Sequence, residues 1–351
     1  MARVLVTGGS GYIGSHTLVE LIADGFEALS VDNGIRSHVS AIDGVRAITG
    51  RDVTNHGVDL RDFAATDNVF ASAGPIDAVI HFAAFKSVPE SVREPLLYFE
   101  NNIGSLVNVL RAVQKHNVPH VVFSSSCSVY GNIAKLPVTE DTALQEPESP
   151  YARTKQMGEQ MLQDIARVSR TTFISLRYFN PVGAHESGLL GEMPFGGPEN
   201  LVPAITQTGI GRRGQLVVYG GDYATRDGTC LRDYVHVSDI ARAHVDAVRY
   251  LMDGRNEHGH EIFNLGSGIG VTVLEAIAAF ERATGVALDY RIGPRRPGDV
   301  EAIYAENTRA RERFGWHPAR DVNVMMSTAW AWEQKLAERA DVHANGGQLQ
   351  D

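Results

Sequence analysis

The chain has 351 residues, 43% of them hydrophobic, and a formal net charge of −10 at pH 7. This size and apolar content allow one large domain or two of ordinary size. No lysine- or arginine-rich block marks a nucleic-acid surface, and the two cysteines and scattered histidines show neither a disulfide framework nor a zinc spacing. The first residues lead directly into an apolar run, so we expect neither a signal peptide nor a membrane-spanning segment. We expect a cytoplasmic protein without a metal, whose partners are neither nucleic acid nor membrane.

The first predicted strand, Val4–Val6, runs into a glycine-rich turn and the start of a helix. Gly8, Gly11 and Gly14 remove the side chains that would keep the backbone away from a pyrophosphate. The free N–H groups that open the following helix favour an anion. This stretch therefore predicts a dinucleotide-binding turn.

The second predicted strand, Ala28–Val31, ends in Asp32. A carboxylate there accepts hydrogen bonds from the adenosine ribose hydroxyls and repels a 2′-phosphate, which favours NAD over NADP. Arg36 leaves NADP open, and Asp32 beside Asn33-Gly34 is also a candidate turn or capping residue.

Short β-rich runs alternate with helical patterns up to about residue 177, which is typical of an α/β fold with a doubly wound, parallel Rossmann sheet. The predicted strands are Val4–Val6, Ala28–Val31, Val53–His56, Ala78–Phe82, Val121–Ser124 and Thr172–Leu176. Ligands of such sheets lie beyond the carboxyl ends of the strands, where this chain carries small or polar residues.

Two predicted helices follow in this half of the chain. One begins near Pro95, ends at about His116 and contains Asn101-Asn102, whose side chains are either exposed or functional. The other follows Ser149-Pro150 and carries Tyr151 and Lys155 on one face.

A phenol and an ammonium four residues apart are often an ordinary amphipathic pair. Beside the strand-end hydroxyl of Ser126 and a dinucleotide, they instead indicate a proton-transfer site. Free tyrosine has a pKa of about 10, and we expect the charges of Lys155 and of an oxidised nicotinamide to lower the pKa of Tyr151.

The character of the chain changes after Arg177. Residues 180–235 are rich in glycine and proline and are predicted to form binding loops. Further elements are predicted as a helix at Val235–Val248, a strand at Glu261–Leu265 and a helix at Val271–Thr284 with Thr272 as a possible cap, before a frayed tail after about Val342. We expect residues 1–179, with a returning segment near 236–266, to form the NAD-binding domain, and 180–351 to form mainly a smaller substrate-binding domain.

The glycine turn, the strand-end serine and the Tyr-x-x-x-Lys helix resemble the extended short-chain dehydrogenase/reductase family, and the chain to about residue 335 is similar to its nucleotide-sugar epimerases. The matching stretches are GGSGYIGSHT (8–17), DN (32–33), HFAAFKSV (81–88), FSSSCSVYG (123–131), SPYARTK (149–155), LRYFNPVGAH (176–185), RDYVHVSD (232–239), NLGSG (264–268) and RRPGD (295–299). The resemblance implies an isomerase that interconverts UDP-glucose and UDP-galactose by transient oxidation at C4, with tightly bound NAD.

The same resemblance implies a role for each matching residue. Tyr151 is the implied base, Lys155 tunes it and Ser126 positions the hydroxyl. The implied cofactor contacts are Gly8, Gly11, Tyr12, Ile13, Gly14, Asp32, Asn33, Ser37, Asp59, Leu60, Phe82, Ala83, Ala84, Lys86, Asn101, Ser126, Tyr151, Lys155 and Phe179. The implied substrate contacts are Lys86, Ser126, Tyr151, Asn180, Asn200, Leu201, Val217, Val218, Tyr219, Arg232, Arg296, Asp299 and Ile303.

Alternative functions follow from single positions. Some relatives carry Tyr and others a small residue where Ile303 stands, so UDP-N-acetylglucosamine and its epimer are alternative substrates. A nucleotide-sugar 4,6-dehydratase needs acids where Cys127 and Ser128 stand, and a non-catalytic NAD-binding protein would have no use for Tyr151. The resemblance also implies a homodimer that packs two helices per subunit, at residues 95–116 and 149–167.

Overall fold

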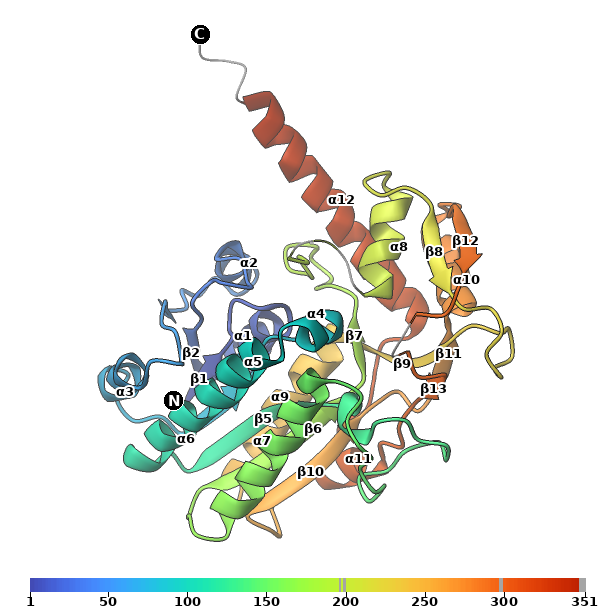
Figure 1. The fold of residues 1–351 in the computed structure, drawn as a ribbon. Helices are drawn as coiled ribbons and strands as arrows, with labels where there is room; N and C mark the ends of the chain where they lie inside the picture. The colour runs from blue at the N-terminus through green and yellow to red at the C-terminus, as the bar shows by residue number, and fades with distance from the viewer. Residues whose placement is uncertain (196, 198–199, 297–298, 347–351) are drawn as a thin grey trace.

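The protein, in a computed structural model, is described for residues 1–195, 197, 200–296 and 299–346. Within these residues a seven-stranded sheet has the order β10-β6-β5-β4-β1-β2-β3, and every neighbouring pair is parallel (Figure 1). Its strands are β1 Arg3–Thr7, β2 Glu27–Val31, β3 Asn55–His56, β4 Ala78–His81, β5 His120–Ser126, β6 Thr172–Tyr178 and β10 His260–Leu265. The predicted doubly wound parallel sheet is therefore confirmed.

Helices cover both faces of this sheet, because successive strand side chains point to opposite sides. Val4 and Val6 pack in one core cluster, and Leu5 between them packs in another. The first face carries α1 Tyr12–Ala23, α2 Ser40–Thr49 and α9 Val237–Met252, and the second carries α3 Phe63–Ser72, α6 Gly104–Lys115 and α7 Pro150–Ala166.

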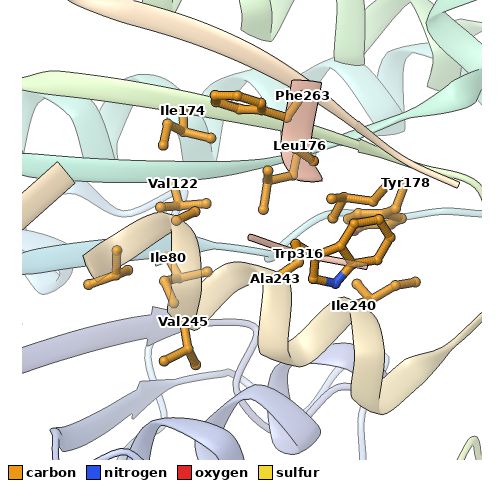
Figure 2. Packing of buried hydrophobic residues seen from close by; sticks show 14 of the residues in the cluster. Ile80, Val122, Ile174, Leu176, Tyr178, Ile240, Ala243, Val245, Phe263 and Trp316 are labelled. Atoms are coloured by element: carbon orange, nitrogen blue, oxygen red, sulfur yellow. The ribbon is translucent and has the colours of Figure 1, made fainter. Parts of the chain in front are cut away.

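The core cluster on the first face is built around α9, and we call it the α9-side cluster. Figure 2 shows Ile80, Val122 and Ile174, from β4, β5 and β6, on the sheet side of α9, whose Ile240 and Val245 belong to the same cluster. These five side chains are fully buried. A segment distant in sequence, α9 with β10, thus completes the N-terminal sheet.

The C-terminal half has its own small sheets and core. In a four-stranded sheet, β9 Leu231–His236 pairs with β7 Asn180–Val182, β11 Gly270–Thr272 and β13 Ala302–Ile303 among the described residues. A pair of parallel strands is formed by β8 Leu216–Tyr219 and β12 Tyr290–Gly293. The accompanying helices are α8 Leu201–Gly209, α10 Val273–Thr284, α11 Thr308–Phe314 and α12 Val322–Gly346.

Several predicted elements differ in detail from the observed ones. The predicted loops over 180–235 contain β7, α8, β8 and β9, because short strands of three to six residues depend on their partners rather than on a local pattern. The predicted Thr272 cap is confirmed, and it forms a capping box with Glu275. The tail was predicted to fray after about Val342, but α12 continues to Gly346. Residues 347–351 of the tail, and Gly196 and Pro198 of the glycine-rich stretch, lie outside the described residues.

The single helix predicted over 95–116 is divided. It comprises α5 Pro95–Tyr98, a π-helical turn at Phe99–Ile103 and α6, and it follows the short helix α4 Val88–Arg93. In the described part of the chain, no helix has both the length and the hydropathy needed to cross a bilayer.

Candidate functional site

The glycine turn between β1 and α1 has no room for side chains. A Cβ on Gly14 would lie 2.1 Å from the carbonyl oxygen of Gly8, and a Cβ on Gly8 would lie 2.8 Å from the amide nitrogen of Ala83. Gly8 also has a φ of +73°, which favours glycine. Gly11 caps α1 without a side-chain hydrogen bond, so the first N–H groups of the helix are left to bind an anion. The turn therefore fits a dinucleotide pyrophosphate.

Tyr12 and Ile13 open α1 just after this turn. The Tyr12 hydroxyl donates to the carbonyl oxygen of Gly183 at 2.6 Å, which fixes the phenol against the C-terminal half of the chain. Ile13 packs its side chain against the α9-side cluster. Both residues thus leave mainly their backbone for the predicted phosphate contact.

Asp32 lies at the carboxyl end of β2, next to the glycine turn. Its carboxylate accepts hydrogen bonds from the Ser10 amide at 3.1 Å, the Gly34 amide at 2.9 Å and the Ser37 hydroxyl at 2.6 Å. The turn interpretation of Asp32 is therefore correct, and the same contacts hold the carboxylate and Ser37 beside the turn. Asn33 is exposed, and its side-chain oxygen accepts from the Ile35 amide.

Arg36, which left NADP open, is engaged elsewhere. Its guanidinium pairs with Glu90 at 2.7 Å and lies 4.9 Å from the ring centroid of Phe85. This cation is therefore paired with a residue of α4 rather than with the carboxylate of Asp32.

The third and fourth strands contribute further predicted cofactor residues. The Asp59 carboxylate accepts a hydrogen bond from Arg61 at 2.6 Å, which holds its pKa below the ordinary value, and the buried Leu60 accepts one at its carbonyl from Asn108. After β4, the backbone amides of Phe82 and Ala83 donate to the carbonyl and hydroxyl oxygens of Thr7, the residue that precedes the glycine turn. Ala84 continues this segment as a half-buried residue.

Lys86 ends this loop in an ion pair with the C-terminal half. Its Nζ lies 2.8 Å from Oε1 of Glu192, and the same oxygen accepts from Asn200 Nδ2 at 3.2 Å. The contact joins one predicted cofactor residue to one predicted substrate residue.

Asn102 is a residue whose role the sequence prediction missed, since it named Asn101. The Asn102 side-chain oxygen accepts from the Phe85 amide at 2.8 Å, and its Nδ2 donates to the Phe85 carbonyl at 3.0 Å and to Thr154 Oγ1 at 3.2 Å. Asn101 donates to Asn102 from the same π-helical turn. Asn102 therefore ties that turn, the loop after β4 and α7 together. The two adjacent asparagines inside a predicted helix were the available signal.

The three predicted catalytic residues meet where β5 ends and α7 begins. The Ser149 hydroxyl caps α7 by accepting from the Ala152 amide at 3.2 Å, and the first helical turn presents Tyr151. Ser126, the last residue of β5, is a hydrogen-bond partner of the Tyr151 hydroxyl. Lys155, one turn further, is buried and donates from Nζ to the carbonyl oxygen of Ser124 at 2.6 Å.

Burial moves both titratable groups of this site toward their neutral forms. It lowers the pKa of Lys155 to about 7 and raises the pKa of Tyr151 to about 12, against the opposing hydrogen bond from Ser126. The expected lowering of the Tyr151 pKa is therefore wrong for the protein groups alone. Desolvation is the largest effect on the pKa of Tyr151. The Lys155 Nζ donates to the Ser124 carbonyl of β5 and lies 5.8 Å from the centre of the Tyr151 ring.

A buried ionic network supports β5 beneath the site, and the sequence analysis missed it. Glu159 Oε2 lies 2.6 Å from Arg177 Nη2, and its other oxygen accepts from the Ser125 hydroxyl. Arg177 also donates to the hydroxyl of Tyr130 at 3.0 Å. Glu159 lies one turn after Lys155 on the same helix, which was the available signal.

At the end of β6, the predicted cofactor contact Phe179 is followed by the first residue predicted to bind only the substrate, Asn180. Phe179 is buried, and the Oδ1 atom of Asn180 is buried without a hydrogen-bond partner among the described residues. An unpaired buried acceptor is costly, so this oxygen is suited to a ligand donor. Asn200 precedes Leu201, the first residue of α8, without capping that helix through its side chain.

Two arginines of the C-terminal half converge on one carboxylate. Arg296 donates to both carboxylate oxygens of Asp299, from Nη2 at 2.9 Å and from Nε at 3.2 Å. Arg232 Nη2 lies 3.8 Å from Oδ1 of the same carboxylate. The Arg296 guanidinium carbon also lies 5.6 Å from the ring centroid of Tyr219. Paired guanidinium groups suit a diphosphate, because each can bind phosphate oxygens in bidentate fashion.

The last predicted substrate residues differ in exposure. Val217 and Tyr219 lie on β8 and are partly accessible, whereas Val218 packs into the C-terminal core and leaves only its backbone for a ligand. Ile303 lies on β13 opposite Arg232 and is only 6% exposed, within the α9-side cluster. Burial raises the pKa of the neighbouring Cys127 thiol to about 12, so this cysteine is a neutral thiol.

Comparisons with known proteins agree with this geometry. Residues 4–266 match the model of the NAD dependent epimerase/dehydratase family. The chain is 45% identical over 333 residues, 95% of this chain and 97% of the relative, to a UDP-glucose 4-epimerase of Yersinia pestis.

Solved structures show the same similarity. A UDP-glucose 4-epimerase of Stenotrophomonas maltophila, solved with NAD and formylated UDP-arabinopyranose, has a TM-score of 0.93 and 43% identity, covering 97% of this chain and 100% of its own. The enzyme of Bifidobacterium longum, solved with NAD⁺ and UDP, has a TM-score of 0.90 and 44% identity, covering 95% and 98%.

Proposed function

The chain belongs to the NAD dependent epimerase/dehydratase family, and on this premise we propose that it interconverts UDP-glucose and UDP-galactose by transient oxidation at C4. The observation that carries the proposal is the meeting of Ser126, Tyr151 and Lys155 near a glycine turn that has no room for a Cβ on Gly8 or Gly14. Relatives that match nearly the whole chain are UDP-glucose 4-epimerases, and two solved ones hold NAD.

In the proposed mechanism, the protein residues move the proton and hold the sugar nucleotide. Ser126 orients the C4 hydroxyl, and Tyr151 accepts its proton. Tyr151 returns the proton after the 4-keto sugar has rotated to present its opposite face. When bound at the glycine turn and Asp32, NAD would supply a reversible hydride acceptor for C4, so that net redox would be zero. Lys155 donates from Nζ to the Ser124 carbonyl and lies 5.8 Å from the centre of the Tyr151 ring, where its positive charge would favour the phenolate.

The proposed anchors lie at the far end of the substrate. Arg232 and Arg296 neutralise the diphosphate, Asp299 binds the uridine ribose, and β8 provides the uracil contacts. With the nucleotide held there, the hexose is free to turn about its link to the diphosphate. We assign the cofactor to residues 1–179 with the returning segment near 236–266, and the nucleotide sugar mainly to residues beyond 180.

The experiment is product analysis with purified protein and no added cofactor. UDP-galactose should yield UDP-glucose, because the NAD that remains bound is regenerated in each cycle. A requirement for stoichiometric NAD in solution, or release of a 4-keto-6-deoxy sugar, would contradict the proposal. The dehydratase alternative is disfavoured because Cys127 and Ser128 stand where that reaction needs acidic side chains.

The same assay with UDP-N-acetylglucosamine and UDP-N-acetylgalactosamine defines the substrate range. The volume around Ile303 limits the sugar end of the site in this proposal, so Ile303→Gly should increase the activity on N-acetylated sugars. No gain in that activity would remove Ile303 from the specificity determinants.

We also propose a cytoplasmic homodimer. Leu96 of α5 is 80% exposed and Val107 of α6 is 37% exposed, so apolar side chains lie on the surface of the segment 95–116 that is expected to pair with a second copy. Sedimentation of the wild type and of Leu96→Asp tests the dimer, and cell fractionation tests the location.

A further inference from the structure

A short segment of the C-terminal half, Leu189–Phe195, crosses to the cofactor-binding half, and we call it the strap. Its outer side is held by α12. Trp332 Nε1 donates to the carbonyl oxygen of Glu192 at 2.8 Å, and a Cβ on Gly191 would meet the Trp332 ring at 2.5 Å. Figure 1 shows this stretch, coloured yellow-green, between α2 and α12. The strap is therefore fixed at its base by close packing.

The inner side of the strap packs on α2. Leu190 is 1% exposed and belongs to the same core cluster as Ala41 and Val45 of that helix. A Cβ on Gly44 would lie 2.8 Å from the carbonyl oxygen of Leu189, so helix and strap are in direct backbone contact.

The remainder of the strap reaches two loops that flank the glycine turn. The Glu192 carboxylate, whose side chain is only 11% exposed, pairs with Lys86 at 2.8 Å. The Phe195 ring stacks on His38 with a centroid distance of 5.0 Å and an interplanar angle of 26°. His38 follows β2 and Lys86 follows β4, and these strands lie on either side of β1, which leads into the turn. The two contacts therefore straddle the dinucleotide site.

We propose that Glu192 and Phe195 are cofactor-retaining residues, and that the strap must open before the dinucleotide can leave. The inference rests on the proposed function, in which NAD is regenerated during each turnover and has no need to dissociate. A closed strap slows release without altering the chemistry at Tyr151. Because Glu192 also accepts from Asn200, the strap connects cofactor retention to the nucleotide-sugar side.

The test measures release of labelled NAD from the loaded protein. Wild type and variants are saturated with labelled NAD, freed of excess by gel filtration and chased with unlabelled NAD. Phe195→Ala and His38→Ala should each release the label about tenfold faster, because each removes the aromatic pair. The double variant should release it no faster than the single variants, and Phe195→Trp should behave like the wild type.

The control is His258→Ala, which removes an exposed histidine distant from the strap in the sequence. Thermal unfolding of each variant shows whether the fold is intact. Release from Phe195→Ala and His38→Ala at the rate of wild type and control would overturn the strap while leaving the proposed function standing. A wild-type protein that neither carries NAD after purification nor takes up added NAD would overturn the proposed function, and the strap with it.

Discussion

At the scale of single residues, the site places acid–base groups where burial weakens their charges. Tyr151 has its pKa raised to about 12, and Lys155 has its pKa lowered to about 7, with desolvation as the main cause in both cases. The hydrogen bond from Ser126 favours the phenolate but does not overcome the burial. The protein groups alone therefore favour a protonated phenol, and the positive charge of an oxidised nicotinamide would favour the phenolate that accepts the C4 hydroxyl proton.

Tyr151→Phe should reduce kcat by about 10²- to 10⁴-fold, the range expected when a positioned acid–base group is lost. Steady-state assays with UDP-galactose measure the effect, and circular dichroism verifies the fold. The matched control is Tyr250→Phe, which removes a phenol hydroxyl from α9. Equal activities of Tyr151→Phe and the control would show that the phenol does not transfer the proton.

At the scale of elements, the sequence predicted the strands of the large sheet well and the connections poorly. The runs that became β1, β4, β5 and β6 are almost completely buried, and those that became β2 and β10 are partly buried; all six are read directly from their apolar residues. The C-terminal strands other than β9 have only two to four residues, so they depend on pairing with neighbouring strands rather than on a local sequence pattern. The π-helical turn at Phe99–Ile103 depends on hydrogen bonds from Asn102 to residues 17 and 52 positions away, which no local pattern shows.

Asn102→Ala should lower the free energy of unfolding by about 2 kcal/mol, because it leaves the partly buried Phe85 amide and carbonyl without their partners. Urea unfolding measures the loss. Asn101→Ala is the control, since that side chain donates only to Asn102 among its described side-chain contacts. Equal stabilities of the two variants would contradict the linking role of Asn102.

At the scale of the whole molecule, the N-terminal sheet brings together residues that the sequence keeps far apart. Asp32, Tyr151 and the segment α9–β10 belong to one unit, which motif order and a family resemblance could predict. The strap could not be predicted, because its contacts with Lys86 and His38 arise only when the chain returns from the C-terminal half. Sequence motifs identify residues that bind ligands, but they give little information on contacts between the N-terminal and C-terminal halves of the chain.

Buried histidines should make the folded protein sensitive to acid. Burial lowers the pKa of His16, His81 and His236 to about 3, and of His244 and His260 to about 4. The unfolded chain binds protons below about pH 6.5, and the folded chain does not, so stability present above this pH is lost as pH falls toward the folded pKa values.

The expected loss between pH 7 and pH 5 is about 2 kcal/mol for one such histidine. Urea unfolding at fixed protein concentration over this range measures the slope. The slope of the free energy of unfolding against pH reports how many protons the chain takes up when it unfolds. In His260→Gln this number should decrease by up to one, because one titrating group has been removed. Stability that does not change from pH 7 to pH 5 would contradict neutral burial of these side chains.

The most direct measurement of the central claim follows an isotope at the reacting carbon. UDP-galactose carrying deuterium at C4 is converted by the purified protein in ordinary water, and the UDP-glucose is analysed by mass spectrometry. Retention of the deuterium at C4 is the predicted result, because the same hydride leaves and returns within one turnover. Exchange of the deuterium for solvent hydrogen would contradict the account.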